Sequence, residues 1–292
     1  MKILTTKTKA VTFAVMATLS MGLTAETQAA EGILQVKETV KSDYAKTKYP
    51  IVMTHGMFGF TRLGTSAFGM DYFYQVLPDL ARNGATVFAT QVSPLESTEV
   101  RGEQLLAQVE EIRALTGKNK VNLLGHSHGG PTVRYIAAIR PDIVASVTGV
   151  AGTFRGSKVA DDILANQDTS TLADFFGGKL LAPIITWAEG NSSLPINTTA
   201  SLISISEKGS AQFNQKFPTA ALAANCNTSG ANLEKGIRYY SWTGKAQITN
   251  ILDVLDSVIS QLAPLSYGNF DNDGLVNRCN AHLGQVIRDN YH

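Results

Sequence analysis

The sequence has few charged residues, only two cysteines and a single long apolar run. Charged residues make up 17% of the 292, and 25 Lys and Arg nearly balance 24 Asp and Glu. No basic tail or charge block is present, so the composition does not predict nucleic-acid binding. The two cysteines, Cys226 and Cys279, allow either one disulfide, which an even count suggests in an exported protein, or two buried thiols.

The one long apolar run lies at the N-terminus and is typical of an export signal. Lys2, Lys7 and Lys9 form a basic start before it, residues 10–23 are too short to span a bilayer comfortably, and Ala29 and Ala30 are small residues suited to cleavage. We interpret residues 1–30 as a signal peptide and residues 31–292 as the exported domain. An uncleaved N-terminal anchor is the alternative.

Strand-like and helix-like segments alternate along the rest of the chain. Helix-like stretches at 72–81, 98–115 and 131–139 separate β-rich runs at 49–54, 85–91, 121–124, 143–150 and 237–242. This alternation predicts an α/β fold, with a mostly parallel sheet and helices on both faces, in one domain. Reactive loops then lie at the carboxyl ends of the strands.

Residues from about 157 to 217 break this alternation. Apolar side chains crowd between residues 172 and 189, where a Gly-Gly pair and Pro183 interrupt them. We interpret the region as a helical lid beside the site. A fixed helical cap that fills the core is the alternative.

The segment Gly125-His126-Ser127-His128-Gly129 is a G-x-S-x-G motif between a strand-like and a helix-like stretch. A serine on such a sharp turn has its Oγ above the sheet edge, and the flanking glycines avoid collisions with the adjacent strand and helix. Ser127 is therefore predicted to be a nucleophile. An ordinary glycine-rich turn is the alternative.

The nucleophile needs oxyanion donors, a base and an acid. The backbone N–H groups of Met57, in the loop at residues 55–59, and of His128 are candidate oxyanion donors. His55, His126 and His128 lie in these turns and precede the acid, which is the wrong order for the base of this fold, so structural roles are predicted for them. Asp271 and Asp273 are candidates for the acid, and Asp273 would orient the base; an ordinary Asp-Gly turn is the alternative.

Four segments together resemble the secreted, foldase-dependent triacylglycerol lipases of Pseudomonas-type bacteria. They are residues 55–60, 125–130, 272–276 and 281–291. The resemblance implies an α/β-hydrolase fold, with Ser127 as nucleophile, Asp273 as triad acid, and Met57 and His128 as oxyanion-hole amides. It also implies a Cys226–Cys279 disulfide, one structural Ca²⁺ held partly by Asp253, a lipid–water interface as the place of action, a foldase partner, and secretion through the periplasm.

Two departures from the family pattern stand out. Where the family usually carries a proline-histidine pair after the strand that ends at Val150, this chain has the sequence GTFRGS at residues 152–157, which predicts a loop of different shape. The family's catalytic histidine, and after it a second calcium carboxylate, lie further from the aspartate than the 19 residues that follow Asp273. We expect the natural protein to continue past His292. The alternatives are His292 or His282 as the base, or a chain without activity.

These observations predict a secreted lipase that hydrolyses long-chain acylglycerols through a serine acyl-enzyme. A short-chain esterase or polyester depolymerase is the alternative within enzymes. A non-catalytic lipid-binding fragment that lacks the triad histidine is the alternative from another class.

Overall fold

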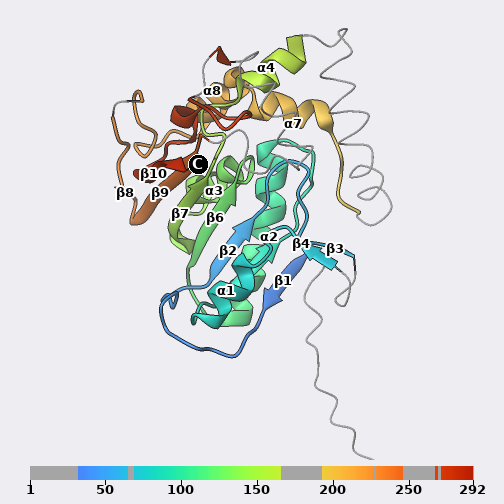
Figure 1. Cartoon of the computed structure of the whole chain (residues 1–292), viewed down its shortest axis with the longest axis vertical. Helices are drawn as coiled ribbons and strands as arrows, with labels where there is room; N and C mark the ends of the chain where they lie inside the picture. The colour runs from blue at the N-terminus through green and yellow to red at the C-terminus, as the bar shows by residue number, and fades with distance from the viewer. Residues whose placement is uncertain are drawn as a thin grey trace, which may run out of the picture.

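A central sheet with helices on both faces carries the site (Figure 1). The computed structural model describes residues 32–64, 69–165, 193–226, 228–245, 267–268 and 271–291. Within them the strand order is β1-β5-β2-β6-β7-β9-β10, with β8 paired to β9. The strands are β1 (Ile33–Val36), β2 (Ile51–Thr54), β5 (Val87–Thr90), β6 (Val121–His126), β7 (Val144–Val150), β8 (Leu233–Glu234), β9 (Ile237–Gly244) and β10 (Gln285–Tyr291).

Most of these strands are parallel, as the alternating pattern predicts. The pairs β2–β5, β2–β6, β6–β7, β7–β9 and β9–β10 are parallel, whereas β1 and β8 are antiparallel to β5 and β9. A separate two-stranded hairpin joins β3 (Arg62–Gly64) to β4 (Gly69–Asp71). The predicted α/β fold is therefore confirmed, and the loops after β2, β6 and β7 meet at one edge of the sheet.

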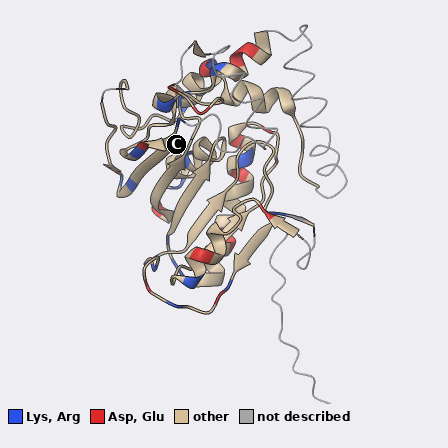
Figure 2. Cartoon of the chain, viewed as in Figure 1, with Lys and Arg blue, Asp and Glu red and all other residues tan. Residues whose placement is uncertain are grey.

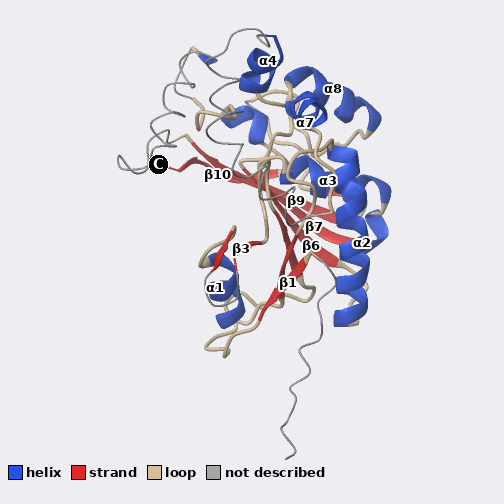
Figure 3. Ribbon diagram, turned by 90° about the vertical axis from the view of Figure 1, so that its right-hand side faces the viewer, coloured by secondary structure: helices blue, strands red, loops and turns tan. Residues whose placement is uncertain are grey.

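Within the described residues, helices lie on both faces of the sheet (Figure 3). Helix α1 (Val76–Arg82) lies on one face, and α2 (Thr98–Thr116) and α3 (Gly129–Ile139) lie on the other. Helix α2 forms because Leu105, Val109 and Ile112 recur at helical spacing, and all three are fully buried against the sheet. Its start is capped by the Ser97 side chain, and it ends at Gly117 in the left-handed conformation.

The strands and helices expected along the main alternation are present, with bounds shifted by a few residues. The sequence did not indicate β1, β3, β4, β8 or β10. Strand β10 was missed because it is an edge strand whose side chains are mostly exposed, so its sequence shows no apolar run or clean alternation.

Three further helices gather at the carboxyl ends of the strands (Figure 1). They are α4 (Lys158–Ala165), α7 (Thr198–Ile205) and α8 (Glu207–Lys216). The Ser157 N–H donates to the carbonyl of Ile205 at 2.7 Å, which joins the start of α4 to the end of α7. A helical insertion is thus present between residues 157 and 217. The apolar stretch at 172–189 lies outside the described residues, and movement of a lid stays a prediction.

A disulfide and a group of charged side chains hold the C-terminal turn in place. Cys226 and Cys279 are joined, with their Cα atoms 5.1 Å apart, so the predicted disulfide is present. The Arg278 guanidinium donates to both carboxylate oxygens of Asp271, at 2.8 and 3.0 Å, and to Asp289 on β10 at 2.7 Å. These contacts fix the turn that contains Asp273 against the edge of the sheet.

Charged residues of both signs are interspersed over the described part of the chain (Figure 2). Several form ion pairs on the surface, such as Arg140 with Glu110 and Asp142. Within the described residues, none of the helices combines the length and the apolar character that crossing a bilayer requires.

Candidate active site

Ser127 lies on the sharp turn between β6 and α3. Its φ is 53°, a left-handed conformation that costs energy for a residue with a side chain. The Ser127 N–H donates to the carbonyl of Val150 at 2.9 Å, and its own carbonyl accepts from the N–H of Gly130 at 2.9 Å. Backbone hydrogen bonds from two directions therefore hold the strained turn.

The glycines on either side of Ser127 are needed because three backbone segments meet there. A Cβ at Gly129 would lie 2.5 Å from the carbonyl oxygen of Thr54, and a Cβ at Gly125 would overlap the carbonyl of Gly129. Neither clash can be relieved by rotating a side chain, because backbone atoms are involved. The structure thus confirms that a side chain at either glycine would collide with the adjacent backbone, as the motif predicted.

Ser127 opens into a largely apolar cavity of about 190 Å³. The loop after β2, the start of α4, helix α7 and the turn after Asp273 all contribute to its wall. The lining residues are Met57, Phe58, Tyr72, His126, Ser127, Thr153, Ser157, Val159, Ala160, Ile163, Thr198, Leu202, Ile205, Leu275 and Val276. The cavity therefore brings three of the sequence motifs together and offers an apolar surface to an acyl chain.

The two predicted oxyanion donors lie beside Ser127. Met57 lines the cavity, and His128 directly follows Ser127 at the N-terminus of α3. Among the described residues, none accepts a hydrogen bond from the backbone N–H of Met57 or of His128. Free amides beside a serine are the arrangement that stabilises a developing oxyanion.

Arg101 anchors the loop that contains Met57, and the sequence analysis did not identify it. Its guanidinium is fully buried and donates to the carbonyls of His55, at 2.7 Å, and Ser93, and more weakly to that of Gly56, at 3.4 Å. Burial lowers the pKa of Arg101 to about 9. A signal was present in the sequence, because Arg101 stands one turn before Leu105 on the apolar face of α2.

Of the three histidines of the turns, His55 and His128 are fully buried and His126 is partly buried, and the lowered pKa values keep all three neutral near pH 7. Burial, the largest cause, lowers the pKa of His55 to about 3 and that of His126 to about 4, and it lowers the pKa of His128 well below its usual value. The Nε2 of His128 lies 2.9 Å from the Thr98 hydroxyl, and the Nδ1 of His55 lies 2.8 Å from the carbonyl of Gly56. These contacts fit the structural roles predicted for them.

Asp273 lies in a tight turn beside the cavity. Its Oδ1 accepts from the backbone N–H of Leu275 at 3.0 Å and of Val276 at 2.7 Å, and both of these residues line the cavity with Ser127. Burial raises the pKa of Asp273, and the backbone hydrogen bonds partly oppose the rise. Asp271, the other candidate, pairs instead with Arg278.

The catalytic base is the part of the predicted site that the described residues do not bring together. His282 is buried, and its Nε2 lies 3.1 Å from a carboxylate oxygen of Asp289, in the charged group next to the disulfide. No histidine among the described residues forms a hydrogen bond with Ser127 or Asp273. His292 lies outside the described residues.

The predicted calcium ligand is also not placed. Asp253 lies outside the described residues. Within the described ranges, no group of three or more His, Cys, Asp or Glu side chains is arranged to hold a metal ion.

The loop after β7, where the sequence differs from the family pattern, is packed around the side chain of Phe154. The Phe154 ring is buried against Gly149 and Gly152, where a Cβ would lie 2.5 Å or less from the ring, so small neighbours accompany the large side chain. Thr153 lines the cavity, and its buried hydroxyl has no hydrogen-bond partner among the described residues.

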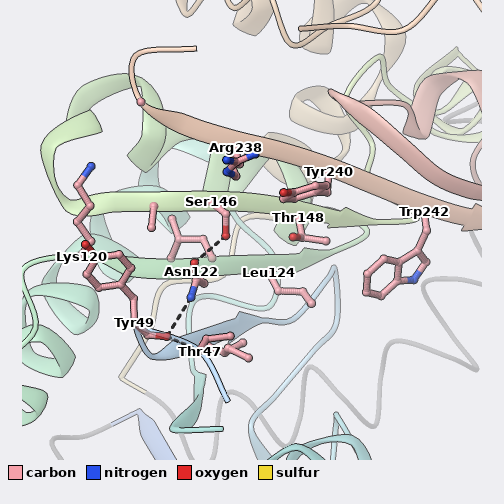
Figure 4. Close-up of a pocket in the computed structure, with 14 residues that line it drawn as sticks. Thr47, Tyr49, Lys120, Asn122, Leu124, Ser146, Thr148, Arg238, Tyr240 and Trp242 are labelled. Carbon is pink, nitrogen blue, oxygen red and sulfur yellow. Dashed lines mark hydrogen bonds between the residues drawn. The ribbon is translucent and has the colours of Figure 1, made fainter. Parts of the chain in front are cut away.

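A larger cavity of about 570 Å³ lies along the strands, away from Ser127 (Figure 4). Its wall comes from β2, β6, β7 and β9, where Asn122 donates to the carbonyl of Tyr49 at 2.9 Å and Ser146 donates to Asn122 at 2.9 Å. These polar groups satisfy one another, and no nucleophile with a neighbouring base lies there, so we assign the chemistry to the smaller cavity.

The fold and the serine turn define an α/β serine hydrolase, and comparison with known proteins agrees. Residues 49–254 match the family described as alpha/beta hydrolase fold. The chain is 47% identical over 251 residues to a triacylglycerol lipase of Vibrio cholerae, covering 85% of this chain and 78% of that protein. It is 35% identical over 259 residues to a triacylglycerol lipase of Pseudomonas fragi, covering 85% and 87%.

A solved structure supports the fold independently. The mature form of the Bacillus licheniformis lipase BlEst2 superposes with a TM-score of 0.61 at 19% identity, covering 88% of this chain and 87% of that one. The chain therefore belongs to the α/β hydrolases and, within them, to the bacterial triacylglycerol lipase family. It is a serine ester hydrolase by this membership.

Replacing Arg101 tests its hold on the Met57 loop. Arg101→Lys keeps the charge but cannot serve the same set of carbonyls, so we expect kcat to fall about tenfold and the free energy of unfolding to fall by about 2 kcal/mol. Arg113→Lys, near the other end of α2, is the matched control for activity and should leave kcat unchanged. Steady-state ester hydrolysis and urea unfolding measure both quantities, and wild-type values for Arg101→Lys would refute the anchoring role.

The buried histidines predict a loss of stability on mild acidification. In the unfolded chain these groups bind protons below about pH 6.5, whereas in the fold their pKa values are depressed, to about 3 for His55 and about 4 for His126. The unfolded state then binds more protons, so the free energy of unfolding must fall as the pH drops from 7 to 5. His128→Gln should lower the number of protons taken up on unfolding, which sets the slope of the free energy of unfolding against pH, by about one. Urea unfolding across this range measures it, and a flat profile would contradict the account.

Proposed function

We propose that the protein hydrolyses long-chain acylglycerols through an acyl-enzyme formed on Ser127. The Ser127 Oγ attacks the ester carbonyl carbon while a histidine base takes the hydroxyl proton. The oxyanion receives hydrogen bonds from the N–H groups of Met57 and His128. The base then protonates the leaving alcohol, and water attacks the acyl-enzyme to release the fatty acid.

The observation that carries this proposal is the strained Ser127 turn at the floor of an apolar cavity, beside backbone N–H groups of Met57 and His128 that no described residue accepts from. Asp273 supports it, because its turn contributes Leu275 and Val276 to the same cavity. In the proposed triad Asp273 orients the histidine and stabilises its charged form. The relatives' names as triacylglycerol lipases support the choice of substrate.

Two alternative functions are each favoured by a specific observation. A short-chain esterase or polyester depolymerase would use the same serine, and the modest cavity of about 190 Å³ is compatible with a shorter acyl group. A non-catalytic lipid-binding protein is favoured by one observation, namely that no described histidine forms a hydrogen bond with the side chain of Ser127 or Asp273.

Removing the nucleophile separates these possibilities. Ser127→Ala should lower hydrolysis of emulsified long-chain triacylglycerol by at least about 10⁴-fold while leaving binding to the emulsion unchanged, because only the attacking oxygen is lost. Ser146→Ala, in the distant cavity, is the matched control. Equal activity of wild type and Ser127→Ala would refute the serine mechanism. Wild-type activity confined to dissolved short-chain esters would favour the esterase, and binding without turnover would favour the lipid-binding protein.

We further propose one structural Ca²⁺, held partly by the carboxylate of Asp253, because the family resemblance and an oxygen ligand suited to Ca²⁺ both point there. Calcium should then raise the thermal midpoint of the wild type, and chelation should lower it. Asp253→Asn should lose most of this response, whereas Asp256→Asn, three residues away, should keep it. A midpoint that does not respond to calcium would contradict the site.

The N-terminal residues and the resemblance support two proposals about the cell. We propose that residues 1–30 direct export, and that a foldase assists folding in the periplasm before secretion. Cell fractionation would find a processed protein outside the cells, and co-expression with a lipase-specific foldase would raise the yield of active protein. An unprocessed cellular protein would contradict the first proposal, and an unchanged yield would contradict the second.

A further inference from the structure

Tyr72 stands between the two loops of the site, although neither the sequence motifs nor the proposed chemistry gives it a role. It follows β4 directly and lines the cavity with Ser127. Its ring lies edge-on to Phe60 and Phe73, with centroids 5.6 and 4.9 Å away, so the phenol is held in one position.

The Tyr72 hydroxyl joins the loop that contains Met57 to the turn that contains Ser127. It accepts a hydrogen bond from the backbone N–H of Gly56 at 3.2 Å, and it lies 2.6 Å from Nδ1 of His126. Gly56 precedes Met57, and His126 precedes Ser127. One oxygen atom therefore contacts the immediate neighbours of both an oxyanion donor and the nucleophile.

The donor and acceptor roles follow from the chemistry of these groups. Burial raises the pKa of Tyr72 and lowers that of His126 to about 4, so near neutral pH a protonated phenol meets a neutral imidazole. The Gly56 N–H is a donor and cannot take the phenol proton, so Nδ1 of His126 is the acceptor within reach of that proton among the described residues. His126 Nδ1 then accepts it, which leaves the imidazole proton on Nε2.

The loop that contains Met57 and the turn that contains Ser127 are closely packed. A Cβ on Gly56 would lie 2.8 Å from the Ser127 Cβ, so the loop and the turn are already in van der Waals contact. Arg101 holds the same loop from the opposite side through the carbonyls of His55 and Gly56. Without the phenol oxygen, the Gly56 N–H would lose its partner on the cavity side.

We propose that Tyr72 is a positioning residue, whose hydroxyl clamps the oxyanion loop to the serine turn and fixes His126 as the Nε2–H tautomer. This inference rests on the proposed ester hydrolysis and deepens it. The clamp sets the distance between the Met57 amide and Ser127, so its loss affects the transition state more than the binding of the ground-state ester.

Tyr72→Phe removes the hydroxyl and keeps the ring. We expect kcat to fall about tenfold with KM within about twofold of wild type, because the oxyanion donor is misplaced but still present. Nitrogen-15 NMR of the imidazoles should show His126 as the Nε2–H tautomer in the wild type and a mixture of tautomers in Tyr72→Phe. Tyr74→Phe, at a tyrosine that is 67% exposed, is the matched control and should change neither quantity.

Each outcome decides the proposal. A wild-type His126 that carries its proton on Nδ1, or a kcat for Tyr72→Phe within about twofold of wild type, would overturn it. The tautomer is read without turnover, so a wild type that hydrolyses no ester refutes the proposed function while the spectrum still decides whether the clamp exists. If Tyr72→Phe does not fold, the wild-type spectrum alone decides.

Discussion

Close packing of backbone around Ser127 is the constraint on which the rest of the site depends. Strand β6, the first turn of α3 and the end of β2 approach so closely that Gly125 and Gly129 have no space for a side chain. This crowding holds Ser127 at a φ of 53° and places its side chain at the cavity. The cost of the strained residue is offset by the parallel sheet and the helix that fix both ends of the turn.

The loop after β2 packs against this turn and is held there by two side chains. Arg101 binds its carbonyls from within the core, and Tyr72 contacts the Gly56 N–H from the cavity side. The loop after β2 contains neither helix nor strand, yet two side chains from distant elements hold its backbone in place. Preorganised amides of this kind stabilise charge in the transition state without the cost of reorienting solvent.

The sequence predicted those parts of the molecule that local patterns encode. The spacing of Leu105, Val109 and Ile112 predicted helix α2, and the glycines around Ser127 predicted the sharp turn. Arg101 and Tyr72 were not predicted, because their roles arise from contacts with backbone 46 and 16 positions away. Strand β10 was not predicted either, because an edge strand with mostly exposed side chains needs no apolar pattern in its sequence. The disulfide was expected from family resemblance and is present.

The central claim is that Ser127 is an activated nucleophile facing an acyl-binding cavity. The most direct measurement is covalent labelling of the native protein by a long-chain alkylphosphonate p-nitrophenyl ester, with the modified residue located by peptide mass spectrometry. The account predicts one equivalent of adduct on Ser127 and none after unfolding in urea. A native protein that stays unlabelled, or that carries the adduct on another residue, would contradict it.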